Sequence, residues 1–317
     1  MDYLEAAKAL SEPAKCLIKA VEGAIGKAYE PVHLKRMADA HAYEIEKVGN
    51  ALRSNADLPI CYEKSDTVSI DTSSYENLIK RTGYRLAYQE IERQSNIECI
   101  INGAYEILKD DYSVVEGEVT REWMNRFIDA AGDISSDDLK KIWSKVLAGE
   151  VKEPSTFSLR TLECLRNMSC EDAVMFKEVC KYAVNNKYIY NEESFLRKHM
   201  DLYNKILKLD ECGLINSSGM IQEINIIDNE TKIFVNFGKY VLVAESDTET
   251  EISLKKFPFT AAGRELCKII DEQMCMEDVK DISKNIINNN KQLSITLHRV
   301  NERYGNIIDY DDDPIEI

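Results

Sequence analysis

The chain has 317 residues, 44% of them hydrophobic and 30% charged, which is enough apolar material for two domains with packed cores. Its formal net charge is -16. Such an acidic chain repels nucleic acid and anionic membranes on average, so both are disfavoured as general ligands, although a local basic patch can still bind either.

Neither targeting signals nor metal-binding motifs stand out. The chain does not open with a basic region and an apolar run, and it has no stretch of about 18 uninterrupted apolar residues. We therefore expect no signal peptide and no transmembrane segment. The nine cysteines include no C-x-x-C pair and the four histidines are scattered, which disfavours a zinc site. Reduced thiols without an export signal predict a cytoplasmic protein.

Residues 4–50 are predicted to be helical, with a break at Pro31. Apolar residues such as Leu17 and Val21 recur at helical spacing within the stretch from Leu4 to Ala28. An apolar face of this kind packs on another helix or lies on a membrane surface. We favour helix packing and keep peripheral membrane contact as the alternative.

The middle of the chain reads as a loop followed by a series of helices. Residues 52–73 are rich in turn-forming residues, and residues 74–112 carry a long helical pattern. A helical pair is expected over 157–167 and 170–185. Hydroxyl side chains that can cap a helix N-terminus mark the starts of three helices, at Thr120, at Ser135 or Ser136, and at Ser169.

The pattern changes after residue 187. A helix over 193–210 ends near Gly213, and a second helix is expected to begin after Thr260. Strands are predicted where apolar and polar residues alternate, over 220–227, 232–237, 239–244, 252–257, 294–300 and 306–310. The tail, with Asp311, Asp312 and Asp313, is expected to be exposed and mobile.

This order of elements predicts a mainly α protein. An N-terminal helical bundle over residues 1–187 is followed by an α+β domain over residues 188–317, with the acidic tail at its end. The order of helix, "CGLI", strands and "FTAAGREL" in the second domain resembles a winged helix. Such modules bind DNA or protein. Lys205 and Lys208 are the candidate DNA contacts, but the net charge disfavours DNA.

No motif for catalysis or cofactor binding is recognisable. The sequence has no phosphate-binding loop, no G-x-G-x-x-G between a strand and a helix, and no G-x-S-x-G elbow. We therefore nominate no catalytic, cofactor or metal residue and expect no cofactor. A cryptic enzyme stays as an alternative, for example a metal-dependent nuclease, because carboxylates can converge in space without a sequence motif.

Two segments carry polar residues that are unusual for a plain scaffold. The first, over 92–98, places Arg93, Gln94 and Asn96 on a helix. The second, over 143–162, contains Glu150 and Arg160 around a turn that Gly149 and Pro154 delimit. The first group is interpreted as an interhelical polar network, in which every member must be hydrogen-bonded, and the second as a tight helix–turn–helix corner with interhelical ties. The alternative is a ligand or partner site.

These segments resemble a known bacterial family. "RQSNIE" at 93–98, "IWSKVLAGEVKEPSTFSLRTLECLRNMS" at 142–169 and "AIGKAYEPVHLKRMADAHA" at 24–42 are similar to the domain of unknown function 2806 family, over residues 15–185 approximately. The family commonly has Pro-Gly before the Phe-Ser, whereas Ser155 follows Pro154 here, so this turn can differ. The resemblance implies a bacterial origin and no defined activity. Related helical proteins with similar starts are grouped with abortive-infection proteins.

The leading functional hypothesis is a non-enzymatic interaction or sensor protein, in phage defence or stress response. Its helical domain would form oligomers or sense a partner, and its winged-helix-like module would bind protein. The first alternative is a DNA-binding regulator that uses the C-terminal module. The second is a membrane-acting effector that uses residues 1–30.

Overall fold

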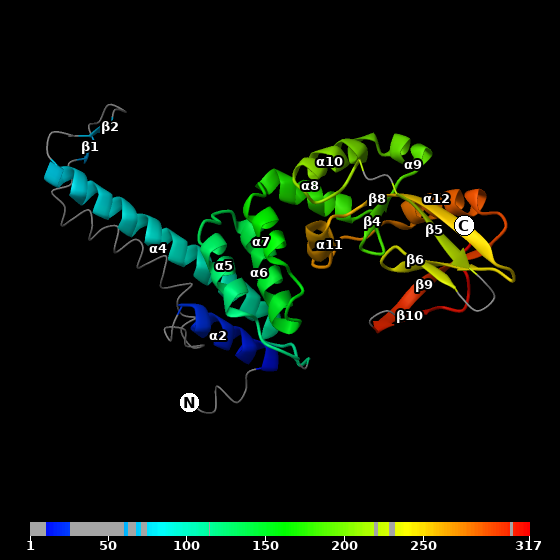
Figure 1. Ribbon diagram of the computed structural model, residues 1–317, viewed down its shortest axis with the longest axis horizontal. Helices are drawn as coiled ribbons and strands as arrows, with labels where there is room; N and C mark the ends of the chain where they lie inside the picture. The colour runs from blue at the N-terminus through cyan, green and yellow to red at the C-terminus, as the bar shows by residue number, and fades with distance from the viewer. Residues whose placement is uncertain are drawn as a thin grey trace. The chain divides into compact units, whose positions relative to one another are not determined.

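The computed structural model describes residues 11–25, 60–62, 68–70, 75–113, 115–218, 221–227, 232–304 and 307–317 (Figure 1). The chain divides into two compact units, Met1–Leu162 and Glu163–Ile317. Among the described residues, helices make up the first unit, apart from one short pair of strands, and the second unit combines helices with two sheets. This confirms the predicted order of a helical part followed by an α+β part.

The contact-based division differs from the predicted domain boundary at residue 187. Residues 163–187 group with the C-terminal unit because α8 (Cys170–Cys180) packs on α10 (Met200–Glu211). A short strand after α8 also pairs into the first sheet of that unit.

The N-terminal unit is built around one long helix. In this unit α4 (Tyr75–Leu108) contacts α2 (Glu12–Ile25), α5 (Arg121–Ala131) and α6 (Asp137–Lys152). The helix α7 (Leu159–Arg166) follows and crosses the division between the units. Thr120 caps α5 by accepting a hydrogen bond from the Trp123 backbone N–H, as the sequence predicted.

Aromatic side chains fill the centre of this unit. Phe127 and Trp143 are fully buried, with ring centroids 5.1 Å apart in an edge-to-face arrangement. The indole N–H of Trp123 donates to the Phe157 carbonyl oxygen at 2.6 Å. This hydrogen bond joins the turn after α6 to the start of α5. The connection between the helices is therefore packed in the same core as the helices.

The described part of the N-terminal helix packs inside this bundle. Ala14, Leu17 and Val21 of α2 are buried, and the Ser11 hydroxyl donates to the Leu108 carbonyl oxygen at 2.6 Å. Helix packing, the favoured alternative, therefore accounts for residues 12–25, and the remainder of the predicted helix lies outside the described residues. No helix in the described ranges combines the length and apolar character needed to cross a bilayer.

The region predicted as a loop over 52–73 contains two short strands. β1 (Ile60–Tyr62) pairs antiparallel with β2 (Val68–Ile70). The loop prediction is wrong at these six positions because β-branched and aromatic residues there alternate with Cys61 and Ser69, a pattern that suits strands despite the polar surroundings.

An ion pair between the ends of α4 and α6 predicts a pH-dependent contribution to stability. Lys152 Nζ lies 2.6 Å from Asp111 Oδ2, and hydrogen bonds from Lys152 and Ser113 lower the pKa of Asp111 to about 2. Because this pKa is below the unfolded value of about 3.9, the contribution is present above about pH 4 and is lost as the pH falls through about 2.

Asp111→Asn is therefore expected to lower the free energy of unfolding by about 1 kcal/mol at pH 7, a value discounted because Lys152 is partly exposed. The difference in the free energy of unfolding between this variant and wild type should become smaller as the pH falls from 5 towards 2. Urea denaturation across this range measures both quantities. A difference that stays constant with pH would contradict the depressed pKa.

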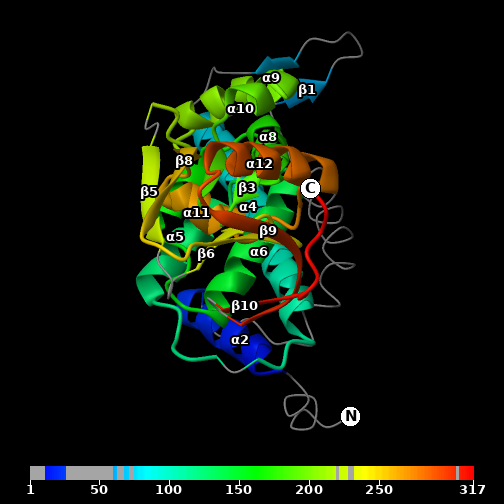
Figure 2. The same ribbon diagram turned by 90° about the vertical axis from the view of Figure 1, so that its right-hand side faces the viewer.

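The first sheet of the C-terminal unit has the order β3-β4-β8-β5. All neighbouring strands in it are antiparallel. Its strands are β3 (Ala183–Val184), β4 (Tyr188–Tyr190), β5 (Ile221–Ile227) and β8 (Thr250–Pro258). The helices that precede, connect or follow these strands along the chain are α8, α9 (Glu193–Lys198), α10 and α11 (Ala261–Cys267). Figure 2 shows the strands and helices of this unit from a second side.

The second sheet has the order β10-β9-β7-β6. Its strands are β6 (Ile233–Asn236), β7 (Tyr240–Glu245), β9 (Ser294–Tyr304) and β10 (Ile307–Tyr310), and α12 (Met276–Asn289) precedes β9 in sequence. The acidic tail is exposed, as predicted, but it is also paired. The backbone N–H groups of Asp311 and Ile315 donate to the carbonyl oxygens of Arg299 and Leu297. These positions were expected to be mobile, and the structure corrects this expectation, because backbone carbonyl groups of β9 accept hydrogen bonds from them.

Three further corrections concern helices of this unit. The helix predicted over 170–185 ends at Cys180, and the one predicted over 193–210 is split at His199 into α9 and α10. The sequence prediction missed α12, although Val279, Ile282 and Ile286 are spaced for one buried helix face.

Candidate functional site: the outer face of α10 and its support

His199 forms the corner between α9 and α10. Its backbone N–H donates to the Phe195 carbonyl oxygen at 3.1 Å, and its carbonyl oxygen accepts from the Leu202 N–H at 2.9 Å. The imidazole ring lies against two aromatic rings, with its centroid 4.6 Å from Phe195 and 5.2 Å from Tyr182. The residue therefore ends one helix, begins the next and directs its side chain inwards.

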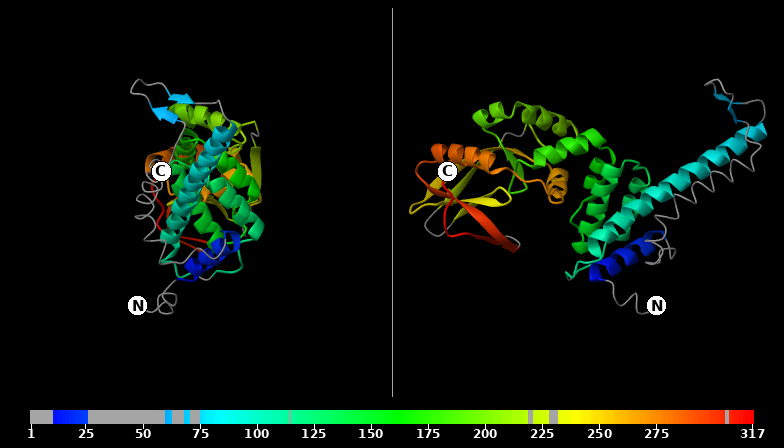
Figure 3. Two further views of the ribbon diagram at one scale, coloured as in Figure 1. Left: turned by 90° about the vertical axis from the view of Figure 1, so that its left-hand side faces the viewer. Right: turned by 180° about the vertical axis from the view of Figure 1, so that it is seen from behind.

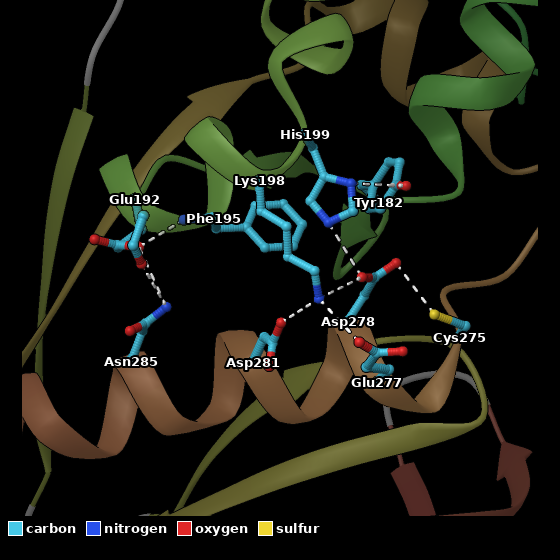
Figure 4. A network of polar contacts seen from close by, with 11 residues as sticks. Tyr182, Glu192, Phe195, Lys198, His199, Cys275, Glu277, Asp278, Asp281 and Asn285 are labelled. Atoms are coloured by element: carbon cyan, nitrogen blue, oxygen red, sulfur yellow. Dashed lines mark hydrogen bonds and ion pairs between the residues drawn. The ribbon is translucent and has the colours of Figure 1, made fainter.

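A buried carboxylate from α12 receives this side chain (Figure 4). Asp278 is 5% exposed, and its Oδ1 lies 3.1 Å from His199 Nε2. Its Oδ2 accepts from the Cys275 thiol at 3.1 Å. Lys198 Nζ lies 3.9 Å from the same carboxylate. Two consecutive residues of the corner, Lys198 and His199, are thus joined to one acidic residue of α12.

Lys198 extends the network to the exposed side of α12. Its Nζ lies 2.6 Å from Asp281 Oδ2 and 3.2 Å from Glu277 Oε1. The hydrogen bonds to Asp281 and Glu277 raise the pKa of Lys198 well above its usual range, so the ammonium stays charged. A second tie joins α9 to α12, because Asn285 Nδ2 donates to Glu192 Oε2 at 3.2 Å.

The arrangement of these groups supports the corner and lacks the geometry of nucleophilic catalysis. A nucleophilic triad places the imidazole between the nucleophile and the carboxylate. Here the Asp278 carboxylate lies between Cys275 and His199, so the thiol contacts a carboxylate and not the imidazole. Among the residues the structure describes, no three His, Cys, Asp or Glu side chains are placed to hold a metal ion.

Three large apolar side chains are exposed on the helix that begins at this corner. Met200 is 72% exposed, Tyr203 43% and Leu207 40%. Their spacing of i, i+3 and i+7 puts them on one face of α10, which we call the α10 outer face. The opposite face carries the buried residues Leu202, Ile206 and Leu209. The helix therefore has an apolar face on each side, and only one of them contributes to the core.

The two lysines predicted as DNA contacts lie on the same helix. Lys205 Nζ is 2.8 Å from Glu178 Oε2 and is also paired with Asp201. Hydrogen bonds to Asp201 and Glu178 raise the pKa of Lys205. Lys208 is exposed. The pKa of Asp172 is lowered mainly by a hydrogen bond from Ser169, and the charge of Lys208 makes a smaller contribution in the same direction. Two carboxylates therefore pair with Lys205, whereas Lys208 is exposed.

Two residues of the first predicted polar network meet at the end of α5. Arg93 Nη1 donates to Asp133 Oδ1 at 2.7 Å and Nη2 to the Asp129 carbonyl oxygen at 3.1 Å. Asn96 is buried, and its Nδ2 donates to the Gly132 carbonyl oxygen at 2.9 Å. Both side chains thus satisfy acceptors at or beside the C-terminus of α5, where positive charge is also favoured.

The other predicted residues do not join them. Gln94 donates to Glu98 on the same helix. Glu150 is buried in α6, and its two oxygens accept from the backbone N–H groups of Ser155 and Phe157 at 2.7 and 2.8 Å. Arg160 lies exposed on α7. Glu150 therefore organises the turn that follows its own helix.

The residues of the C-terminal site were not predicted from the sequence. The sequence does contain a signal for the exposed residues. Met200, Tyr203 and Leu207 are spaced as one apolar helix face, and the buried residues of α10 are spaced as another, so the sequence indicates a helix with two apolar faces. The pairing of His199 with Asp278 has no such signal, because the two residues are 79 positions apart and α12 was not predicted.

Removal of the Asp278 carboxylate is expected to destabilise the C-terminal unit by about 2 kcal/mol, because the His199 and Cys275 donors lose their acceptor inside the protein. Asp281→Ala is the matched control on the same helix. Its carboxylate is more exposed, and a loss below about 1 kcal/mol is expected. Thermal unfolding followed by circular dichroism compares Asp278→Ala with this control. Equal losses would show that burial of Asp278 is unimportant.

Comparison with known proteins gives one match. Residues 80–201 match a family model described as Protein of unknown function (DUF2806), which confirms the resemblance over that range. The match extends from α4 to the first residues of α10. None of the curated proteins compared, and none of the solved structures, matches the chain.

Proposed function

We propose that this chain, whose residues 80–201 belong to the DUF2806 family, is a non-enzymatic interaction protein that binds a partner protein on the α10 outer face. The observation that carries the proposal is the exposure of Met200, Tyr203 and Leu207 on one side of a helix whose other side is buried. Exposed apolar groups gathered on one helix face are typical of protein docking sites.

The order of elements supports α10 as the contact helix. The sequence α8, β4, α9, α10, β5, β8 and the strand order β4-β8-β5 resemble those of a winged helix, which supports this interpretation of the module. In helix-turn-helix modules the second helix of the pair contacts the ligand, and α10 occupies that position after α9. Strands β6 and β7 are inserted between β5 and β8 and belong to the second sheet instead.

The charges favour protein over DNA. DNA affinity depends on lysine and arginine that are available to phosphates. Lys205 is paired with two carboxylates, and the turn into β8 presents the exposed acidic residues Asp247, Glu249 and Glu251. The ring centroid of Tyr203 is 6.2 Å from that of Phe257 in β8, so the apolar surface borders this strand. A partner with apolar anchor residues and a neutral or basic rim fits this surface and the net charge of -16.

The proposal is tested by cross-linking from the α10 outer face of the full chain in bacterial cells. A photoreactive amino acid replaces Leu207 in one variant and Ile107 in a second, because both positions are exposed and apolar. We expect a discrete protein adduct from position 207 and none from position 107. The captured protein, once purified, should bind the wild-type chain and fail to bind Tyr203→Glu/Leu207→Glu.

A DNA-binding arm completes this test. Full-length chain is titrated with duplex DNA at low salt, and Lys208→Glu is compared with wild type. Salt-dependent DNA binding that Lys208→Glu abolishes would overturn the proposal in favour of a DNA-binding regulator. The absence of any protein adduct from position 207 would also overturn it.

A role in phage defence or stress response stays a prediction from the family resemblance, and a cytoplasmic location stays a prediction from the cysteine pattern of the sequence. The identity of the cross-linked protein tests the former directly. If it is a phage component or a defence protein, the defence role gains support; a metabolic enzyme would point elsewhere.

A further inference from the structure

The helix α4 is much longer than the helices that pack on it. Its 34 residues span about 51 Å, whereas the 16 residues of α6 span about 24 Å. Burial is described for residues 81–108 of α4, and within this range the buried residues begin at Asn96 and continue to Leu108, among them Ile100 and Ala104. Figure 3 shows the first half of α4 extending beyond α5 and α6. This half, residues 81–95, has no buried residue.

A second apolar stripe runs along this projecting half. Tyr84, Tyr88 and Ile91 are spaced i, i+4 and i+7, and Ser95 continues the row. Tyr88 is 61% exposed. At about 100° per residue, Tyr88 lies about 160° around the helix from the buried Ala104. The stripe is therefore not a continuation of the core-facing side, and a helix can approach it from the side opposite to the core of the unit.

The stripe has the heptad pattern of a short coiled coil. Tyr84 and Ile91 occupy d positions, while Tyr88 and Ser95 occupy a positions. The flanking e positions are then Arg85 and Glu92, which have opposite charges. In an antiparallel pair of helices, e positions face e positions of the partner, whereas in a parallel pair they face g positions. The g positions here are Ala87 and Gln94, which carry no charge.

We propose that residues 81–95 of α4 pair antiparallel with the same residues of a second copy of this chain. The two-fold axis passes near Gln89, so Tyr88 packs against Ile91 of the other copy, and Tyr84 against Ser95. Arg85 of each copy then faces Glu92 of the other. The two-fold axis makes these two ion pairs equivalent. Closed two-fold assemblies are the commonest homo-oligomers, and their interfaces are self-complementary in this way.

Among the described residues, none from another helix is hydrogen-bonded to Arg85. Arg85 is exposed and donates to Gln89 on its own helix at 2.7 Å, a surface bond that an ion pair across the interface replaces. The contact is short, and a weak, concentration-dependent dimer is expected.

The experiment is analytical ultracentrifugation of the full chain over a dilution series. Wild type should change from dimer to monomer on dilution. Tyr88→Glu should be monomeric throughout. Leu86→Glu is the matched control, because Leu86 is 49% exposed on the same stretch of helix but points away from the stripe. This control should dimerise like wild type.

Charge reversal tests the antiparallel register. Arg85→Glu and Glu92→Arg should each weaken dimerisation on the order of tenfold, because each change places like charges at two symmetric contacts. The double variant Arg85→Glu/Glu92→Arg should restore it. High salt should weaken the wild-type dimer.

A monomeric wild type at every concentration would overturn the proposal, including the case in which residues 26–59 of the same chain cover the stripe. A dimer that Tyr88→Glu leaves intact, or a double variant no better than the single ones, would do the same. These outcomes do not depend on α10, since none of the substituted residues lies in that helix.

Discussion

Gly263→Ala is expected to destabilise the C-terminal unit by about 3 kcal/mol or more. A Cβ atom at position 263 would lie 2.0 Å from the Leu214 carbonyl oxygen and 3.0 Å from its carbon, far inside van der Waals contact. That carbonyl cannot move freely because it accepts a hydrogen bond from the Thr260 N–H at 3.0 Å. The start of α11 and the end of α10 would have to separate.

Urea denaturation followed by circular dichroism measures this effect. Gly83→Ala is the control, because a Cβ there meets nothing within 4 Å and alanine favours a helix. The control should be neutral or more stable by up to about 1 kcal/mol. If Gly263→Ala has the same urea midpoint of unfolding as wild type, α11 does not approach the Leu214 carbonyl group as closely as described.

Glu150→Ala is expected to destabilise the N-terminal unit by about 3 kcal/mol. The carboxylate is 2% exposed and accepts from the Ser155 and Phe157 N–H groups, which would lose their acceptor inside the protein. Ser155 also has a positive φ of 73°, so the turn needs this support. Glu150→Gln should have a smaller effect, because the amide keeps one accepting oxygen.

Tryptophan fluorescence reports on this variant selectively. The chain has two tryptophans, Trp123 and Trp143, and both lie in the N-terminal unit. Glu153→Ala is the control three residues further on, where the side chain is exposed, and a change within about 0.5 kcal/mol is expected. Equal unfolding curves for Glu150→Ala and wild type would mean that the turn does not depend on the carboxylate.

Local patterns were sufficient to predict most of the helices and strands. The long apolar period of α4, the hydroxyl caps Thr120, Ser169 and Thr260, and the β-branched and aromatic residues of β5 to β8 each act within a few residues, so they can be read directly. The split at His199 could not, because α9 ends there to let the imidazole reach a carboxylate of α12.

The candidate site was harder to predict for the same reason. Arg93, Asn96 and Glu150 were selected as unusual polar residues, and the structure gives each of them a hydrogen-bonding partner within the N-terminal unit. In contrast, the importance of Met200 and Leu207 depends on exposure, which is decided by which face of α10 meets the core. Sequence spacing identifies two apolar faces but does not say which one remains open.

The most direct measurement for the central claim is calorimetric titration of the full chain with the purified protein that cross-links to position 207. Tyr203→Glu/Leu207→Glu should weaken binding by at least about 30-fold, as expected for the loss of a buried apolar anchor, while Ile107→Glu should match wild type. An affinity unchanged by the double substitution on α10 would contradict the claim that its outer face binds the partner.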